Sequence, residues 1–240
     1  MSEIAGRMSI QLGVRFLENI YGGKGVLPGG VPGVSPANVV IIGGGIVGEN
    51  AAKMAIGLGA HTTLLDINME RLRQLENTFN GKLYTLASNE FNIAEQVRQA
   101  DLLIGAVLIP GARAPKLVSE KMVETMDQGS VIVDVAVDQG GSIETIDQIT
   151  THENPIYQKY GVNHCAVANI PGAVGRTSTF SLTNVTAPFV LQLADQGFHQ
   201  FGSENQTFVR GVNTYQGNIV HQAVAEALGK KHVEATDIFA

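Results

Sequence analysis

The sequence has one cysteine and no long apolar run, and each shortage excludes a class of protein. Cys165 alone cannot form an intrachain disulfide, and no cluster of Cys and His has zinc-site spacing, so we expect a reducing compartment and no metal. No segment approaches the roughly 20 apolar residues that cross a membrane. Residues 1–7 carry an early acid and no cationic leader, unlike a signal peptide. We therefore expect a cytoplasmic protein that is not embedded in a membrane.

Positive charge is scarce as well. The formal net charge is −6 and no basic block offsets it, so the electrostatic footprint of a nucleic-acid-binding protein is missing. The hydrophobic fraction of 44% and the charged fraction of 16% are typical of globular proteins, and 240 residues suffice for a large domain with a smaller addition. We expect a compact fold that does not bind DNA or RNA.

Apolar spacing divides the chain into segments. An apolar residue at every fourth position predicts a helix over residues 3–20, with Ser2 as its N-cap, and a loop rich in Gly and Pro follows to residue 36. From residue 38 onward, short apolar runs alternate with helical segments, which is typical of βαβ units around a parallel sheet. The expected strands are residues 39–42, 62–65, 82–86, 102–106, 131–135 and 165–168. The expected helices between them are residues 47–59, 69–79, 93–99 and 118–126.

After Pro171 the strand signals fade, and two helical stretches remain over residues 179–196 and 216–228. We therefore predict the α/β class: a Rossmann-type, doubly wound parallel sheet with flanking helices from an incomplete second domain. The predicted parts are a connecting helix over residues 1–21, a dinucleotide-binding Rossmann domain over 22–172, and a helical part of the second domain over 173–240. In this scheme the first helix packs with the C-terminal third.

A glycine-rich turn directly follows the first expected strand and opens a helix. Gly43 suits the tight turn, Gly45 lets a pyrophosphate approach the backbone, and Gly48 allows close packing of helix on strand. The helix N-terminus, at Ile46 and Val47, offers free N–H groups and the positive end of the helix dipole to phosphates. The motif alone is weak, because many ordinary turns are rich in glycine.

An acid at the end of the second strand strengthens this interpretation. Asp66 lies eighteen positions after Gly48, where the acid that binds the ribose of NAD belongs, although an isolated Asp there would more often cap a strand. A carboxylate accepts hydrogen bonds from the ribose diol and repels the 2′-phosphate of NADP, so we expect NAD. Arg71 could stack on the adenine or meet a phosphate, or it could lie on a solvated helix face.

Six further segments carry a resemblance to a known family. They are MSEIAGR at 1–7, GGVPGV at 29–34, GAVLIPG at 105–111, APKLV at 114–118, DVAVDQGG at 134–141 and NIPGAV at 169–174. These segments resemble those of alanine dehydrogenases, the NAD-dependent enzymes that interconvert L-alanine with pyruvate and ammonia. They span most of the chain and are more specific than the glycine-rich turn. The resemblance implies a Rossmann fold, NAD as the cofactor, L-alanine or pyruvate as the substrate and a homo-oligomer, often a hexamer.

Residue roles carry over by position. The resemblance implies cofactor contacts at Ser2, Asp66, Arg71, Ser88, Val107, Leu108, Val135, Ala136, Val137, Asp138, Val167, Ala168, Asn169 and Ile170. It also implies that Asp138 is the catalytic acid–base residue beside the nicotinamide. Without the resemblance, an Asp before Gln139 and two glycines would most often form a turn. Asn169 could orient the nicotinamide or substrate, or be a satisfied loop amide.

The resemblance assigns no residues of this chain to binding the substrate. Family members carry a further segment before the position that matches Met1, and it is implied to hold the catalytic histidine and the cations that grip the substrate carboxylate. We therefore expect this chain to be the NAD-binding portion of an alanine dehydrogenase, and its activity alone stays open. Two alternatives are a non-catalytic NAD-binding module and the NAD-binding domain of a proton-translocating transhydrogenase.

Overall fold

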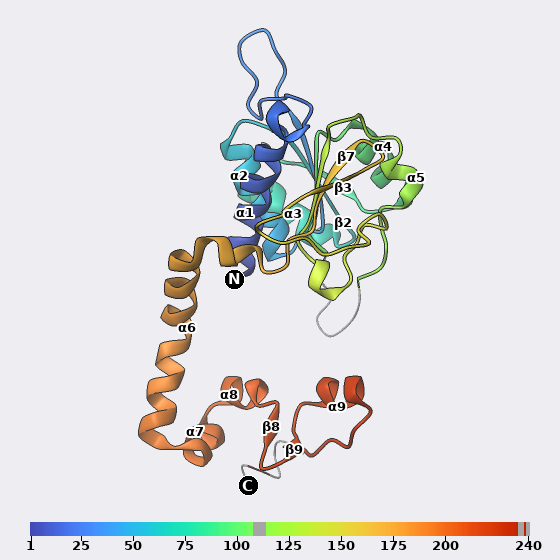
Figure 1. Ribbon diagram of the computed structural model, residues 1–240. Coiled ribbons are helices and arrows are strands. Elements are labelled where there is room, and N and C mark those ends of the chain that lie inside the picture. The colour runs from blue at the N-terminus through green and yellow to red at the C-terminus, as the bar shows by residue number, and fades with distance from the viewer. Residues whose placement is uncertain (108–113, 235–237, 239–240) are drawn as a thin grey trace. The chain divides into compact units, whose positions relative to one another are not determined.

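The computed structural model describes residues 1–107, 114–234 and 238 (Figure 1). They form two compact units, Met1–Gly175 and Arg176–Ala240. In the described parts of the chain, no helix is long and apolar enough to span a bilayer.

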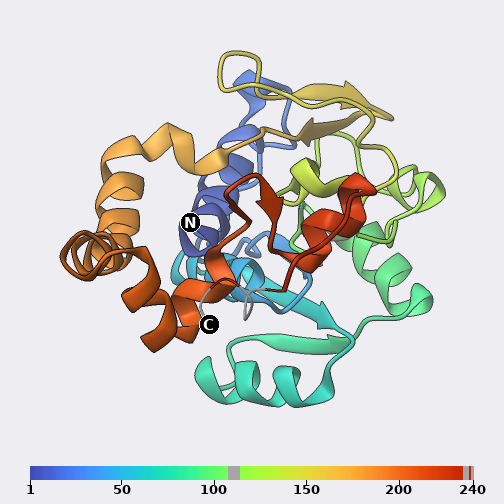
Figure 2. The same cartoon turned by 90° about the horizontal axis from the view of Figure 1, so that it is seen from below.

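The first unit is built on a seven-stranded sheet of order β3-β2-β1-β4-β5-β7-β6. Its strands are β1 (Asn38–Ile42), β2 (His61–Asp66), β3 (Tyr84–Ala87), β4 (Leu102–Gly105), β5 (Val131–Asp134), β6 (Tyr157–Lys159) and β7 (Val162–Cys165). All neighbours are parallel except β6 and β7. The β3 and β6 edges lie at opposite sides of the unit (Figure 2). The six predicted parallel strands are therefore present, and the short edge strand β6 is an addition.

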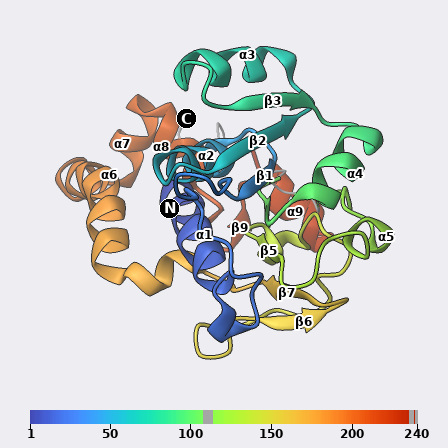
Figure 3. The ribbon, with the colours of Figure 1, turned by 90° about the horizontal axis from the view of Figure 1, so that it is seen from above.

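Helices cover both faces of this sheet, as the alternation of helical segments predicted. Helices α1 (Ser2–Phe16), α2 (Ile46–Gly57) and α3 (Met69–Thr78) pack on one face, in a cluster with strand residues such as Ile41, Leu64 and Ile104. Helices α4 (Glu90–Gln99) and α5 (Glu120–Val123) pack on the other face, against Ile42 and Leu103 (Figure 3). This is a doubly wound α/β sheet, so the predicted fold class is confirmed.

The first helix belongs to this unit, and its expected packing with the C-terminal third stays a prediction. A Cβ added at Gly6 would lie 2.2 Å from the carbonyl oxygen of Val47, and one at Gly13 would lie 2.4 Å from Leu102. The two glycines thus let α1 approach α2 and β4 closely. Helix α1 ends at Phe16, before the expected residue 20, and Met1 is its N-cap in place of Ser2.

Strand β7 occurs three residues earlier than the expected strand 165–168. The sequence pattern missed it because Asn163 and His164 are polar but fully inside the fold. The Asn163 side-chain amide donates to the carbonyl oxygens of Phe16 and Tyr21, both at 3.4 Å, and the His164 ring contacts Thr145 Oγ1 and Val162 O. Buried polar groups are tolerated when they are hydrogen-bonded in this way.

Two further predicted helices are much shorter than expected. The helix expected over 118–126 reduces to α5, because Val118 instead forms a parallel bridge with Ile143. The helix expected over 216–228 begins only at α9 (Gln222–Leu228). Before it, β8 (Thr214–Tyr215) and β9 (Asn218–Ile219) form a hairpin whose turn residues Gln216 and Gly217 have φ of 45° and 81°. Left-handed conformations at both positions are typical of a two-residue hairpin turn.

The second unit is mainly helical. It contains most of α6 (Gly175–Gln196), then α7 (Phe198–Glu204), α8 (Gln206–Gly211), the β8–β9 hairpin and α9. An aromatic cluster holds the middle of this unit together: the ring centroids of Phe198 and Tyr215 are 4.5 Å apart, and those of Phe201 and Phe208 are 4.7 Å apart. The residues that the sequence assigned to helices over 179–196 lie within α6.

Candidate dinucleotide-binding site

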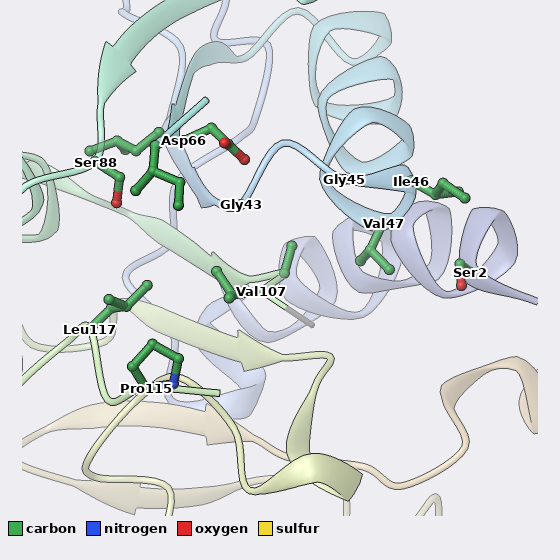
Figure 4. Close-up of a pocket in the computed structure, with 13 residues that line it drawn as sticks. Ser2, Gly43, Gly45, Ile46, Val47, Asp66, Ser88, Val107, Pro115 and Leu117 are labelled. Atoms are coloured by element: carbon green, nitrogen blue, oxygen red, sulfur yellow. The ribbon is translucent and has the colours of Figure 1, made fainter. Parts of the chain in front are cut away.

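A cavity of about 440 Å³ opens where the sheet's parallel strands end (Figure 4). Gly43 follows β1, Asp66 ends β2, Ser88 follows β3 and Val107 follows β4, so four strands contribute to one edge. The cavity is lined by Ser2, Gly43, Gly45, Ile46, Val47, Leu65, Asp66, Ile67, Ser88, Ala106, Val107, Pro115 and Leu117. Ligands of open α/β sheets bind at this carboxyl edge.

The three glycines of the turn each meet a different steric requirement. Gly43 has a φ of 106°, a conformation that L side chains rarely adopt. A Cβ at Gly48 would lie 1.8 Å from the carbonyl oxygen of Gly43, so α2 could not pack on the turn with any larger residue. A Cβ at Gly45 would meet no atom of the described residues within 4 Å, because this position faces the open cavity.

The start of α2 fits an anion. Gly45 is the N-cap of α2 and supplies no side-chain hydrogen bond to the helix, and Ile46 and Val47 follow it at the cavity wall. The first N–H groups of a helix have no partner within the helix, and they lie at the positive end of its dipole. The donors at this wall therefore suit a pyrophosphate, which is the fit that a dinucleotide requires.

The Asp66 carboxylate is held by two backbone N–H groups. Gly44 N donates to Oδ2 at 2.6 Å, and Asn68 N donates to Oδ1 at 2.8 Å. Each carboxylate oxygen can accept a second hydrogen bond, so the group keeps acceptor capacity toward the cavity. Asp66 thus caps the end of β2, as the alternative interpretation held, and also lines the cavity.

Arg71 has partners that the sequence did not indicate. Its Nε donates to the carbonyl oxygen of Gly44 at 2.7 Å, and its Nη2 forms an ion pair with Glu49 of α2. The guanidinium is therefore neither on a freely solvated helix face nor among the residues that line the cavity. Its predicted contact with the cofactor stays a prediction.

The other predicted residues divide into two groups. Those that line the cavity are Ser2, Gly43, Gly45, Ile46, Val47, Asp66, Ser88 and Val107. Those that do not line it are Gly48, Arg71, Val135, Ala136, Val137, Asp138, Val167, Ala168, Asn169 and Ile170, and Leu108 lies outside the described residues.

The sequence did not predict the apolar wall of the cavity, which consists of Leu65, Ile67, Ala106, Pro115 and Leu117. Ile67, 84% exposed just after Asp66, had a usable signal: an apolar residue beyond the strand end.

The segment after β5 carries Asp138 at the same edge of the sheet. Asp134, the last residue of β5, is buried and accepts hydrogen bonds from Ala136 N at 3.0 Å and Ser142 N at 2.9 Å. Burial raises the pKa of the Asp134 carboxyl, although these backbone donors oppose the shift. Lys116 Nζ donates to the carbonyl oxygen of Gly140 at 2.6 Å. We call residues 135–143 the Asp138 loop, which is fastened at both ends while Asp138 itself is exposed.

The segment after β7 is fixed in a strained turn. Asn169 is exposed and has a φ of 54°, and its carbonyl oxygen accepts from Gly172 N at 2.8 Å. Val167 and Ile170 are buried in the core, so only their backbone could face a ligand. Cys165 is buried just before them, and burial raises the pKa of its thiol to about 11, so this thiol is a core group that stays protonated near neutral pH.

Known proteins share this fold and much of this sequence. Residues 9–222 match the family described as alanine dehydrogenase/PNT, C-terminal domain. The chain belongs to this family. An alanine dehydrogenase of Methanococcus maripaludis is 65% identical over 227 residues, which is 95% of this chain and 61% of that protein. The family assignment confirms the resemblance seen in the sequence, and the chain spans about 61% of the length of that curated relative.

Two solved structures resemble the fold of this chain. An L-alanine dehydrogenase structure superposes with a TM-score of 0.91 at 52% identity, covering 95% of this chain and 63% of that one. A transhydrogenase from Sinorhizobium meliloti has a TM-score of 0.61 at 26% identity, covering 72% of this chain and 49% of that one. Among these two, the alanine dehydrogenase is the nearer relative by both measures.

Proposed function

We propose that the chain binds NAD(H) and acts as the cofactor-binding portion of an L-alanine dehydrogenase. The observation that carries this proposal is the cavity that combines the glycine turn, residues 43–48, with the Asp66 carboxylate. The 65% identity to an alanine dehydrogenase supports the choice of reaction. NAD is favoured over NADP because a carboxylate at the end of β2 would repel a 2′-phosphate.

Each part of the cofactor has candidate partners in the chain. Asp66 would accept from the adenosine ribose hydroxyls, and the N–H groups at Ile46 and Val47 would bind the pyrophosphate. The exposed side chain of Ile67 offers an apolar surface beside Asp66 for the adenine. The nicotinamide end would then be served by the Asp138 loop and Asn169, in the roles that the family resemblance implies.

The proposed reaction converts L-alanine, NAD⁺ and water into pyruvate, ammonium, NADH and a proton. Bound NAD⁺ would supply the acceptor for the hydride that leaves Cα of alanine. Asp138 would accept a proton at its carboxylate from the amine or from the attacking water, because it is exposed in the loop that follows β5. The segment of the relatives that this chain does not match would bind the substrate carboxylate, and Arg176–Ala240 would belong to the same substrate domain.

A titration of the chain with NADH tests the binding part of this proposal. We expect the fluorescence of NADH to change on binding, and the change to be lost in Asp66→Arg, which replaces an acceptor by a bulky cation. Glu76→Arg is the matched control, because it makes the same charge change at an exposed position of α3 outside the cavity. Failure of the unaltered chain to bind NADH would overturn the proposal.

An activity assay tests the dehydrogenase part. NAD reduction with L-alanine is measured for the chain alone and for the chain fused behind the unmatched N-terminal segment of the Methanococcus maripaludis relative, with NADH binding as the check on folding. Activity in either form supports the proposal. NADH binding without activity in both forms would contradict it and favour a non-catalytic module.

Compartment and assembly are parts of the same proposal. The buried, protonated thiol of Cys165 suits a reducing compartment such as the cytoplasm. A homo-oligomer is implied by the family resemblance, and light scattering on the eluting protein would give its size.

A further inference from the structure

Gly44, between the first two motif glycines of the turn, is hydrogen-bonded on both sides. Gly44 N donates to Asp66, and the Gly44 carbonyl oxygen accepts from Arg71 Nε at 2.7 Å. The same guanidinium pairs with Glu49, which lies in the first turn of α2. The side chains of Arg71 and Glu49 are only 28% and 36% exposed, so water screens their interaction incompletely. The result is one network that joins α2, the glycine turn, β2 and α3.

Without Glu49, Arg71 would suit a different ligand. Arg71 lies five residues after Asp66, on the helix that follows β2, and a guanidinium near this strand end is a natural partner for a 2′-phosphate. In this structure two of its five N–H groups are used by the Gly44 carbonyl and Glu49. The Glu49 carboxylate also balances its charge. A cation that is both anchored and neutralised attracts a phosphate weakly.

We infer that Glu49 is a specificity-determining residue, which excludes NADP by keeping the Arg71 guanidinium on the glycine turn. Asp66 excludes the 2′-phosphate by repulsion, and Glu49 withholds a nearby cation, Arg71, that could offset this repulsion. The inference rests on the proposed function, because it concerns the same cavity. It assigns a role in cofactor choice to a residue outside the cavity wall.

Binding measurements separate this inference from the proposed function. Dissociation constants for NADH and NADPH are measured by calorimetry or by competition for bound NADH, and the readout is their ratio. We expect Glu49→Gln to shift the ratio toward NADPH by about tenfold, because it frees a charged donor group for the phosphate. If the unaltered chain does not bind NADH, the proposed function itself fails. If the chain binds NADH and only the ratio is unchanged in Glu49→Gln, the inference about Glu49 fails and the proposed function stands.

A double-mutant cycle tests whether the effect acts through Arg71. In an Arg71→Ala background, Glu49→Gln should leave the ratio unchanged, because no guanidinium remains to be released. Glu70→Gln is the matched control: it removes an equal charge from the first turn of α3, where Glu70 pairs with Arg73, and should not shift the ratio. An unchanged ratio in Glu49→Gln, or an equal shift with and without Arg71, overturns the inference. Melting temperatures verify that each variant folds.

Discussion

The glycine turn and the Asp138 loop lie at one edge of the same sheet but are held in place differently. The glycine turn is contained within residues 38–66, and its shape follows from backbone conformation and from the absence of side chains at Gly43 and Gly48. The Asp138 loop depends on a buried carboxylate, Asp134, and on a lysine from another loop. A binding surface made of backbone can be encoded locally, whereas a reactive side chain must be positioned by contacts distant in sequence.

The largest effect should come from filling the glycine turn. Gly48→Val would drive its side chain into the Gly43 carbonyl, so we expect a loss of about 3 kcal/mol in unfolding free energy and no NADH binding. Chemical denaturation measures this loss. Gly57→Ala, at the end of the same helix with nothing within 4 Å of the added Cβ, should be neutral or gain about 0.5 kcal/mol. Equal stability of the two variants would contradict the steric account.

Removing the support of the Asp138 loop should lower the free energy of unfolding by less than filling the glycine turn does. Asp134→Ala leaves the N–H groups of Ala136 and Ser142 without their acceptor, so we expect a loss of about 2 kcal/mol. NADH should still bind, because the glycine turn is unchanged. Ser142→Ala is the control in the same loop: its Oγ is buried with no hydrogen-bond partner among the described residues, and its removal should not destabilise. Loss of NADH binding in Asp134→Ala would show that the two regions are not separable.

The free energy of unfolding, measured as a function of pH, tests the role of His164 in β7. Burial lowers the pKa of His164, and its ring lies between Thr145 and the Val162 carbonyl, with Lys159 and Asp147 as nearby charges. The folded state therefore binds a proton at His164 less well than the unfolded state does. The neutral His164 ring leaves the free energy of unfolding undiminished above the unfolded pKa of about 6.5. As the pH falls from there toward and through the folded pKa, the free energy of unfolding decreases by at most about 1.4 kcal/mol per pH unit.

Thermal melts at pH 7.5 and 5.5 check this sign. The melting temperature should fall on acidification, and His164→Gln should show a smaller fall because it has no proton to take up. A variant with the same pH dependence as the unaltered chain would refute the role of His164.

The smallest structural effect is expected at Asp138. Its side chain is exposed, so Asp138→Asn should change the unfolding free energy by no more than about 0.5 kcal/mol and leave NADH binding intact. In the fused, active form, NAD reduction with L-alanine should fall by about 100-fold or more, because a positioned base is removed. Activity close to that of the unaltered form would exclude Asp138 as the acid–base residue.

The same contrast explains what could be predicted from the sequence. The glycine turn and Asp66 were found from residue types and spacing alone, because the βαβ unit is local. The predicted bounds of β7 were wrong, because the buried Asn163 and His164 look like loop residues until their distant partners are known. The hairpin before α9 was also missed, although Gln216 and Gly217 carry a turn signal. Glu49 and Arg71 are 22 positions apart, so no local pattern could reveal their ion pair.

The role of Asp138 came only from family resemblance. The structure explains why: an exposed Asp on a short turn has no local feature that distinguishes catalysis from turn formation. Its candidate role depends on the buried Asp134, which holds the backbone of the Asp138 loop, and on the ligand proposed at this edge of the sheet.

The central claim is that the open face of the glycine turn holds a dinucleotide. Calorimetric titration of NADH into the unaltered chain and into Gly45→Val tests it most directly, because Gly45 has an extended backbone and, among the described residues, no neighbour within 4 Å of an added Cβ. The account predicts equal melting temperatures for the two chains and NADH binding only by the unaltered one. Equal affinity for NADH in both chains would contradict it.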